Sequence, residues 1–350
     1  MQYILIGHFI NPETLVMPDT IASSKALVGR LRSALYDCDA GVLNEQLGGL
    51  FSEDCAVRLP YPIGDVTGAT GLFDRGFRPL LHGVPDLERR DYIMAGAIDR
   101  GECWVGCGGY YTGVFEDAWL SIPSTRHVIT MRYIEFFRVE HDKIVEAKLL
   151  WDIPALMMQA GAWPMAPSLG VEFNVPGPAT NDGIMMGESN PERSAASMAL
   201  VNAMVEGLGR FAEGGAEAME LEKFWHPKMN WYGPAGIGSN RRISGFRNWH
   251  QIPFLRAMPD RSSDTRNGAY DCYFADGDYV LFCGWPGMKA TITGDGWMGI
   301  SPAGQKIDMT SLDIWRCENG LIRENWVMID ILDIWNQVGV DVLARMREMT

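Results

Sequence analysis

"MRYIEFFRVEHDKIVEAKLLWDIPALMMQAG" (Met131–Gly161) recurs in altered form as "MTSLDIWRCENGLIRENWVMIDILDIWNQVG" (Met309–Gly339). The two stretches align without gaps at a shift of 178 residues, with nine identical positions. Upstream, "GLFDRGFRPLLHGVPDL" (Gly71–Leu87) aligns with "GFRNWHQIPFLRAMPDR" (Gly245–Arg261) at a shift of 174. Because these matches keep their order along the chain, we interpret the chain as a tandem duplication.

Each copy has the same predicted order of elements. A helix opens it, at residues 23–36 and again at 194–211, with apolar side chains four apart on one face of the first. A shorter helix, a strand, a middle helix and several long strands follow. The steps His141–Asp142 and Asn319–Gly320 stand where hairpin turns are expected. Helices followed by a meander of antiparallel strands indicate an α+β fold.

The length of 350 residues is sufficient for two domains of ordinary size. We predict an N-terminal arm at residues 1–21, a first domain at 22–161, a linker at 162–191 and a second domain at 192–350. The linker assignment rests on its prolines and glycines, which break helical and strand periodicity. Its apolar residues predict that it lies against a domain surface.

Composition narrows the classes of function. The formal net charge is −14 and no basic block occurs, which disfavours a nucleic-acid partner. No stretch approaches the roughly 18 apolar residues of a membrane span, and the N-terminus lacks the pattern of a signal peptide, so we expect a cytoplasmic protein. The seven cysteines and six histidines are scattered without metal-ligand spacing. We therefore expect reduced thiols, no metal and no cofactor.

The repeated segments resemble the SnoaL-like polyketide cyclases of the nuclear transport factor 2-like superfamily. The residues that carry the resemblance are "VPDL" (Val84–Leu87), "IPSTRHVI" (Ile122–Ile129) and "FFRVEHDKIVEAKLLWD" (Phe136–Asp152), with "MPD", "GWMGISPAGQKI" and "IWRCENGLIRENWVMID" in the second copy. The resemblance implies two tandem cone-shaped α+β barrels, each a curved antiparallel sheet packed on helices around an apolar pocket. It also implies an internal pseudo-two-fold pair within a monomer, or a homodimer.

The resemblance further implies cofactor-independent acid/base chemistry on a small organic substrate, such as a polyketide-like, hydroxy or keto compound. Cyclisation, isomerisation, dehydration and hydrolysis all use such chemistry. The alternative is a non-catalytic protein that binds a small molecule or a partner through the same pocket, because one fold hosts many functions.

The resemblance places the general acid/base of the family at Asp152 and Asp330, where the last strand of each copy ends. In the second copy, alternation puts Glu324, Trp326, Met328 and Asp330 on one face, which relatives direct into the cone. Burial in an apolar cone raises the pKa of a carboxyl toward the range of proton transfer. Alternatively, each Asp only caps the following helix.

The two copies differ at this face. Lys148 stands where the second copy has Trp326, and we expect it to reach Asp152 in a more polar first pocket. The alternative is an ordinary ion pair in a first site that has decayed. The second copy is richer in aromatic residues, which can line a substrate pocket or simply form a core; the candidates are Trp231, Tyr232, Trp249, Trp285 and Trp297.

Two further positions carry ionisable groups. His250 is a candidate second proton carrier, with a surface or core histidine as the alternative. The aligned acids Glu135 and Asp313 stand in the middle of equivalent strands. The sequence leaves open whether they face a cavity or the interface between sheets.

Overall fold

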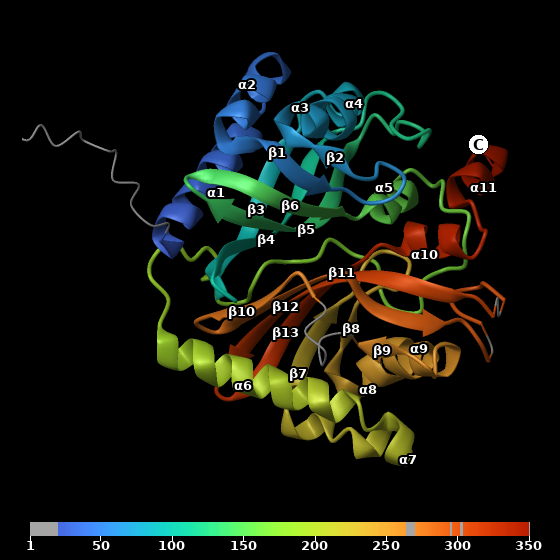
Figure 1. The fold of residues 1–350 in the computed structure, drawn as a ribbon. Helices are drawn as coiled ribbons and strands as arrows, with labels where there is room; N and C mark the ends of the chain where they lie inside the picture. The colour runs from blue at the N-terminus through green and yellow to red at the C-terminus, as the bar shows by residue number, and fades with distance from the viewer. Residues whose placement is uncertain (1–19, 264–269, 295, 302–303, 350) are drawn as a thin grey trace, which may run out of the picture.

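The computed structural model describes residues 20–263, 270–294, 296–301 and 304–349. Two α+β units stack so that their sheets face each other, with α1–α4 and α6–α9 outside and α5 and α10 near the junction (Figure 1). The strand order is β2-β1-β6-β5-β4-β3 in one sheet, and β8-β7-β13-β12-β11-β10 in the other, where β9 also pairs with β11. Corresponding strands occupy corresponding places. This repeated order confirms the tandem duplication and the α+β cones predicted from the sequence.

The first copy begins with two helices that precede its sheet. Its elements are α1 (Ile21–Tyr36), α2 (Ala40–Leu50), β1 (Phe51–Arg58), β2 (Val66–Thr67), α3 (Gly68–Leu72), η1 (Phe73–Phe77), α4 (Arg78–Gly83), β3 (Glu88–Asp99), β4 (Glu102–Val114), β5 (Val128–Glu140), β6 (Lys143–Trp151) and α5 (Ile153–Gln159).

The second copy repeats this plan and adds a C-terminal helix. Its elements are α6 (Pro191–Leu208), α7 (Phe211–Ala218), η2 (Leu221–Lys223), β7 (Trp225–Tyr232), β8 (Asn240–Arg241), α8 (Arg242–Phe246), η3 (Arg247–Gln251), α9 (Ile252–Ala257), β9 (Ser262–Ser263), β10 (Cys272–Asp276), β11 (Tyr279–Thr291), β12 (Lys306–Glu318), β13 (Leu321–Ile329), α10 (Ile331–Gln337) and α11 (Val342–Met349).

Local sequence signals fix several of these boundaries. Thr20 and Ser23 form a reciprocal capping box at the start of α1, and the Asn190 side chain accepts from the Arg193 N–H at the start of α6. His141–Asp142 and Asn319–Gly320 have positive φ angles, which match the two-residue hairpin turns expected between the last long strands.

The two sheets pack through an apolar layer that both copies supply. Trp104, Ile134 and Leu150 of the first copy meet side chains of the second, which include Leu281, Leu312, Ile314 and Met328. The sheets approach closely enough that a Cβ on Gly106 would lie 2.5 Å from Leu281. Each sheet therefore has two buried faces, one toward its own helices and one toward the other copy.

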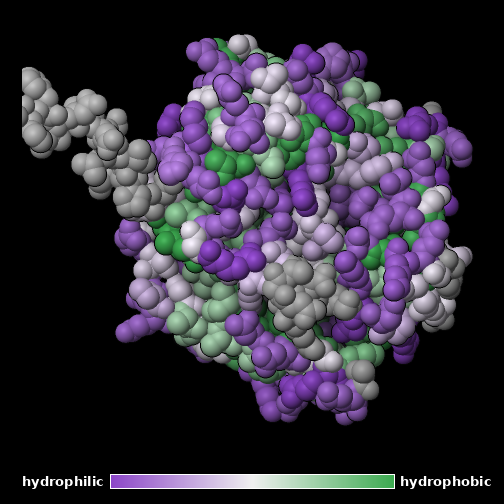
Figure 2. Space-filling model, viewed as in Figure 1, coloured by the Kyte–Doolittle hydropathy of each residue, from purple (hydrophilic) through white to green (hydrophobic). Residues whose placement is uncertain are grey.

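The segment between α5 and α6 follows the junction of the two copies. Val171 forms an isolated bridge with Ser239 of the second copy, and Ile184 forms one with Met94 of the first. The face in Figure 2 is mostly polar, while most large apolar side chains lie in the interior. Within the described residues, no helix is both long and apolar enough to cross a membrane.

Candidate functional site

Asp152 and Asp330 contact the opposite copy of the fold. The Asp152 carboxylate accepts from the Ala235 N–H at 3.1 and 3.3 Å, and Asp330 Oδ2 accepts from the Tyr61 N–H at 2.9 Å. Ala235 and Tyr61 belong to the loops that follow β7 and β1. The two acids thus form a reciprocal pair of contacts between the copies. The family resemblance implied that each acid points into its own cone, and the structure corrects this expectation.

The capping alternative applies to Asp330. Its Oδ1 accepts from the Asp333 N–H at 3.1 Å at the start of α10. The Asp152 side chain makes no such capping bond to α5; it lies 3.5 Å from the Arg132 guanidinium. Burial raises the pKa of Asp330 to about 7, and burial also raises the pKa of Asp152, against the effect of Arg132.

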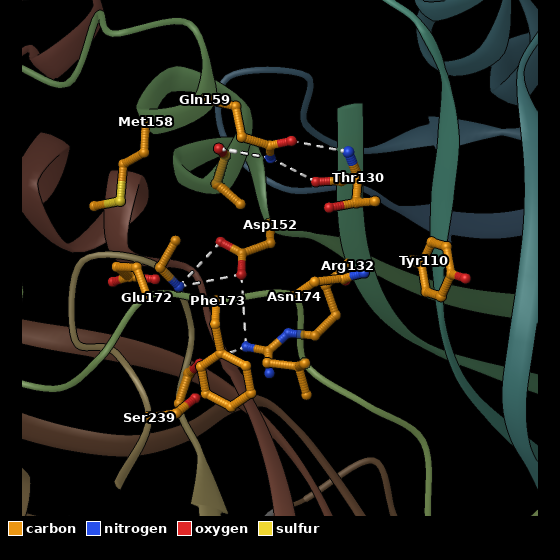
Figure 3. A pocket seen from close by; sticks show the side chains of 14 residues that line it. Tyr110, Thr130, Arg132, Asp152, Met158, Gln159, Glu172, Phe173, Asn174 and Ser239 are labelled. Atoms are coloured by element: carbon orange, nitrogen blue, oxygen red, sulfur yellow. Dashed lines mark hydrogen bonds and ion pairs between the residues drawn. The ribbon is translucent and has the colours of Figure 1, made fainter. Parts of the chain in front are cut away.

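A cavity of about 380 Å³ lies beside Asp152, between the two copies and the linker (Figure 3). The Arg132 guanidinium crosses it to donate to the carbonyls of Tyr232, Gly233 and Val327 in the second copy. The polar groups of this cavity bond mainly to one another, so it has the character of an interdomain junction. Its lining consists of Tyr110, Thr130, Arg132, Asp152, Ala155, Met158, Gln159, Glu172, Phe173, Asn174, Val175, Gly233, Ala235 and Ser239.

The face of β13 that was expected to line the cone instead packs against the first copy. Trp326 and Met328 belong to the apolar layer between the sheets, and the Trp326 indole donates to the Pro176 carbonyl of the linker at 3.0 Å. Glu324 accepts from Arg316 at 2.6 Å. Alternation was correct, but it assigns two faces without saying which is inside, and both are apolar here because both are buried.

Other sequence candidates are also outside the cones. Lys148 lies on the intersheet face and pairs with Asp271 of the second copy at 2.6 Å, not with Asp152. Tyr232 and Trp285 pack on the intersheet layer. Trp249 is 52% exposed on η3. The first-copy ion pair is thus a contact between copies, and it contributes nothing to a first pocket.

The first cone is filled by a buried charged network. The Arg89 guanidinium bonds to Asp91 at 2.9 and 3.0 Å and to Glu135 at 2.5 Å. Tyr111 and Trp151 donate to Glu135 at 3.0 and 2.9 Å. Arg32 also lies 3.1 Å from Asp91, so two cations balance the two carboxylates, and the hydrogen bonds satisfy Glu135 at the centre of the cone. The first cone is therefore closed at its centre by its own buried side chains.

The second cone carries Asp313 at the position equivalent to Glu135, with a different environment. The Asn325 side chain donates to Asp313 Oδ1 at 3.3 Å, and among the described residues no cation pairs with this carboxylate. Loss of hydration raises the pKa of Asp313 to about 7. Asp313 lies directly across from Phe282 on β11 and Val327 on β13, so its carboxyl stands in the middle of the cone's sheet.

His250 and two predicted tryptophans also lie inside the second cone. The His250 ring stacks on Trp231 at 4.1 Å and on Phe254 at 5.6 Å, and Phe254 packs edge-on against Trp297 at 5.9 Å. Burial lowers the pKa of His250 to about 3. His250 is consequently neutral near pH 7 and forms part of an aromatic wall, which favours the alternative of a core histidine.

The second cone is more accessible than the first at equivalent positions. Trp315 is 8% exposed and its counterpart Phe137 is 0% exposed; for Phe254 and Leu80 the values are 8% and 0%, and for Ile329 and Trp151 they are 9% and 2%. Asp313 also keeps accessible surface in mid-strand, whereas Glu135 is almost fully buried. Because neighbouring strands cover the backbone at mid-sheet, this surface opens toward the cone interior.

Sequence reasoning did not choose Asp313 as the central acid. Its alignment with Glu135 was visible, but the direction of both side chains depends on which sheet face packs against helices. The covering helix held a usable signal, since His250 and Phe254 lie four apart on it and both face inward. Arg89, which closes the first cone, has no signal in the aligned segments.

A family model described as SnoaL-like polyketide cyclase matches residues 208–338, which lie in the second copy. The second copy thus matches the family that the resemblance indicated. No curated protein matches the chain. Similar solved structures include IdmH of Streptomyces antibioticus, named as a candidate polyketide cyclase, at 20% identity, with 40% of this chain and 98% of that chain covered and a TM-score of 0.34.

Two further solved structures are similar to a single copy. A candidate SnoaL-like polyketide cyclase from Jannaschia sp. CCS1 is 17% identical, with 39% and 90% of the two chains covered and a TM-score of 0.34. AclR of Streptomyces galilaeus, named as a candidate hydroxylase, is 20% identical, with 42% and 82% covered and a TM-score of 0.32.

Proposed function

We propose that the second cone is the active site of a cofactor-independent acid/base enzyme of the SnoaL-like type. The observation that carries the proposal is Asp313, an acid in an aromatic cone with an amide as its bonded partner and a pKa raised to about 7. Near neutral pH such a carboxyl is present in both protonation states, so one group can remove a proton and return it.

The proposed substrate is a small organic molecule with a carbonyl or hydroxyl group. The Asp313 carboxylate takes a proton from the carbon next to the carbonyl, and the electron pair of that C–H bond moves into the resulting enolate. The protonated Asp313 then returns the proton to the same or another atom. In a cyclisation the enolate carbon instead attacks a second carbonyl carbon of the substrate; the π pair of that carbonyl moves to its oxygen, which takes the proton from Asp313 as the ring closes. Trp231 and the neutral His250 provide a flat apolar surface for the substrate.

Deuterium incorporation tests the proposal before the natural substrate is known. The protein is incubated in D₂O with a panel of ketones and hydroxyketones, and loss of the α-proton signal is followed by NMR. We expect exchange with wild type and a decrease of at least about 100-fold in Asp313→Asn, which is the usual contribution of a general base. Glu135→Gln in the closed first cone is the matched control and should exchange normally.

The alternative function is binding without chemistry in the same cone. It is favoured if panel members bind to wild type and to Asp313→Asn with equal affinity while neither protein accelerates exchange. Exchange that persists at the wild-type rate in Asp313→Asn excludes this residue as the proton carrier.

A further inference from the structure

Cationic side chains of the first copy extend into the second at several points. Lys148 pairs with Asp271 at 2.6 Å, and Arg58 Nη1 donates to the Trp285 carbonyl at 2.8 Å. Arg100 donates to the Tyr270 carbonyl at 3.1 Å and lies 4.5 Å from the centre of that ring. The first copy thus contacts the start of β10 and the irregular middle of β11 with three charges.

These contacts are joined to one another. Asp271 uses one carboxylate oxygen for Lys148 and accepts from the Trp285 N–H with the other, at 2.7 Å. Arg58 binds the carbonyl of that same Trp285. Lys148 is 1% exposed, so water screens the attraction between Lys148 and Asp271 less than in a surface pair. A continuous polar chain therefore ties β1 and β6 of the first copy to two strands of the second.

The segment held in this way forms one wall of the second cone. The Tyr270 and Tyr273 rings pack on Phe282 at 6.0 and 5.9 Å. Phe282 is the direct cross-strand neighbour of Asp313. A shift of the residues around Asp271 would therefore reach the proposed proton carrier through a single layer of aromatic rings.

The second copy has no cations at the positions equivalent to Arg58 and Lys148. The positions equivalent to Arg58 and Lys148 in the second copy are Tyr232 and Trp326, which have no charge. Both of these lie in the intersheet layer. The second copy instead holds the first through Asp276, which pairs with Lys25 of α1 at 2.6 Å and accepts from the Gly96 N–H of β3 at 3.0 Å. The link from Lys148 and Arg58 to residues 270–288 is therefore not repeated in the opposite direction.

We propose that the first copy is a domain that positions the site of the second, with Lys148 as the principal positioning residue. This inference rests on the proposed function for its catalytic consequence. The structural part of the inference is that the Lys148–Asp271 ion pair holds residues 270–288, which form one wall of the second cone, in place beside Asp313.

Hydrogen–deuterium exchange and the ketone panel test the inference separately. In Lys148→Met we expect amide exchange to rise at least tenfold in peptides covering residues 270–288 and to stay unchanged in β5. Asp271→Asn should reproduce this effect without leaving a bare charge, because Lys148 keeps its 2.8 Å contact with Glu146. Lys148→Arg should restore most of the protection. The matched control is Arg138→Met, which also breaks a pair with Glu146 but contacts only the first copy in the ion pairs of the described residues.

The catalytic part has its own readout. Loosening of the wall admits water to Asp313, so the pD midpoint of α-proton exchange should fall in Lys148→Met and Asp271→Asn and return in Lys148→Arg. A uniform rise of amide exchange over both copies, or none at residues 270–288, would overturn the positioning role. If wild type exchanges no ketone proton, the proposed function fails, while the amide-exchange contrast still decides whether Lys148 holds the wall.

Discussion

The carboxylate of Asp330 accepts a hydrogen bond from the backbone N–H of Tyr61, and these two residues belong to different copies of one fold. The same contact occurs in the opposite direction between Asp152 and Ala235. An acid that ends the last strand of each copy therefore secures the loop after the first strand of the other. This relationship gives a structural reason why both copies have an Asp at this position, and it requires no catalytic role for either.

Asp330 should make stability depend on pH. Its pKa is raised from 3.8 to about 7 in the folded protein, so between these values the folded state holds a proton that the unfolded chain has released. The stabilising contribution of this group is then fully present below pH of about 4 and is lost as pH rises through 7, by up to about 4 kcal/mol. We expect Asp330→Asn to flatten this slope in urea unfolding measured from pH 5 to 8. The exposed Asp54→Asn should leave the slope unchanged.

Asp313 should set the pH dependence of proton exchange. The ionised carboxylate is the base, so the rate of α-proton removal should rise with pH and level off above a midpoint near 7. NMR initial rates at constant ionic strength measure this profile. A midpoint near 4, the ordinary range of a carboxyl, would contradict the assignment of Asp313 as the base.

His250 should be needed for packing and not for proton transfer. Its pKa of about 3 keeps it neutral over the working range, so His250→Phe should leave the shape of the pH profile intact and cost less than about 1.5 kcal/mol. His250→Ala removes the ring that stacks on Trp231 and should cost about 3 kcal/mol by opening a cavity. Loss of one limb of the profile in His250→Phe would restore the histidine as a proton carrier.

Arg89 should be a major contributor to the stability of the first cone. Arg89→Met leaves the buried Glu135 without a cation, while Asp91 keeps Arg32, and breaking a buried pair in this way typically costs about 3–5 kcal/mol. Urea unfolding measures the loss, and the double variant Arg89→Met with Glu135→Gln should recover part of it. The exposed Arg78→Met is the control, with an expected change within about 0.5 kcal/mol.

Much of the fold was predictable because the duplication places the same sequence pattern at equivalent positions of both copies, and each occurrence supports the other. The hairpin turns at His141–Asp142 and Asn319–Gly320 located the strands on either side of them, and the aligned sequence segments located the two cones. The site was less predictable for a physical reason. A sheet buried on both faces has apolar residues on both, so alternation along β13 could not show that Trp326 faces the other copy and Val327 the cone.

The predicted candidates that lie in the second cone are mostly on elements with one buried side. His250 and Trp297 line the second cone because the helix and the turn that hold them have one buried side, which sequence reasoning can identify; Trp231 lines it from strand β7. Lys148 was singled out correctly as a difference between copies, but its partner Asp271 lies 123 residues away and no local pattern predicts that pair.

Fusion of the two cones into one chain has an evolutionary consequence. In a homodimer every substitution appears in both subunits, so an arginine that fills one cone would fill the other as well. A single chain keeps its halves together at high effective concentration and lets each accept its own mutations. Arg89 could therefore enter the first cone while the second kept Asp313, whose carboxylate pairs with no cation among the described residues, so each copy became free to take its own function.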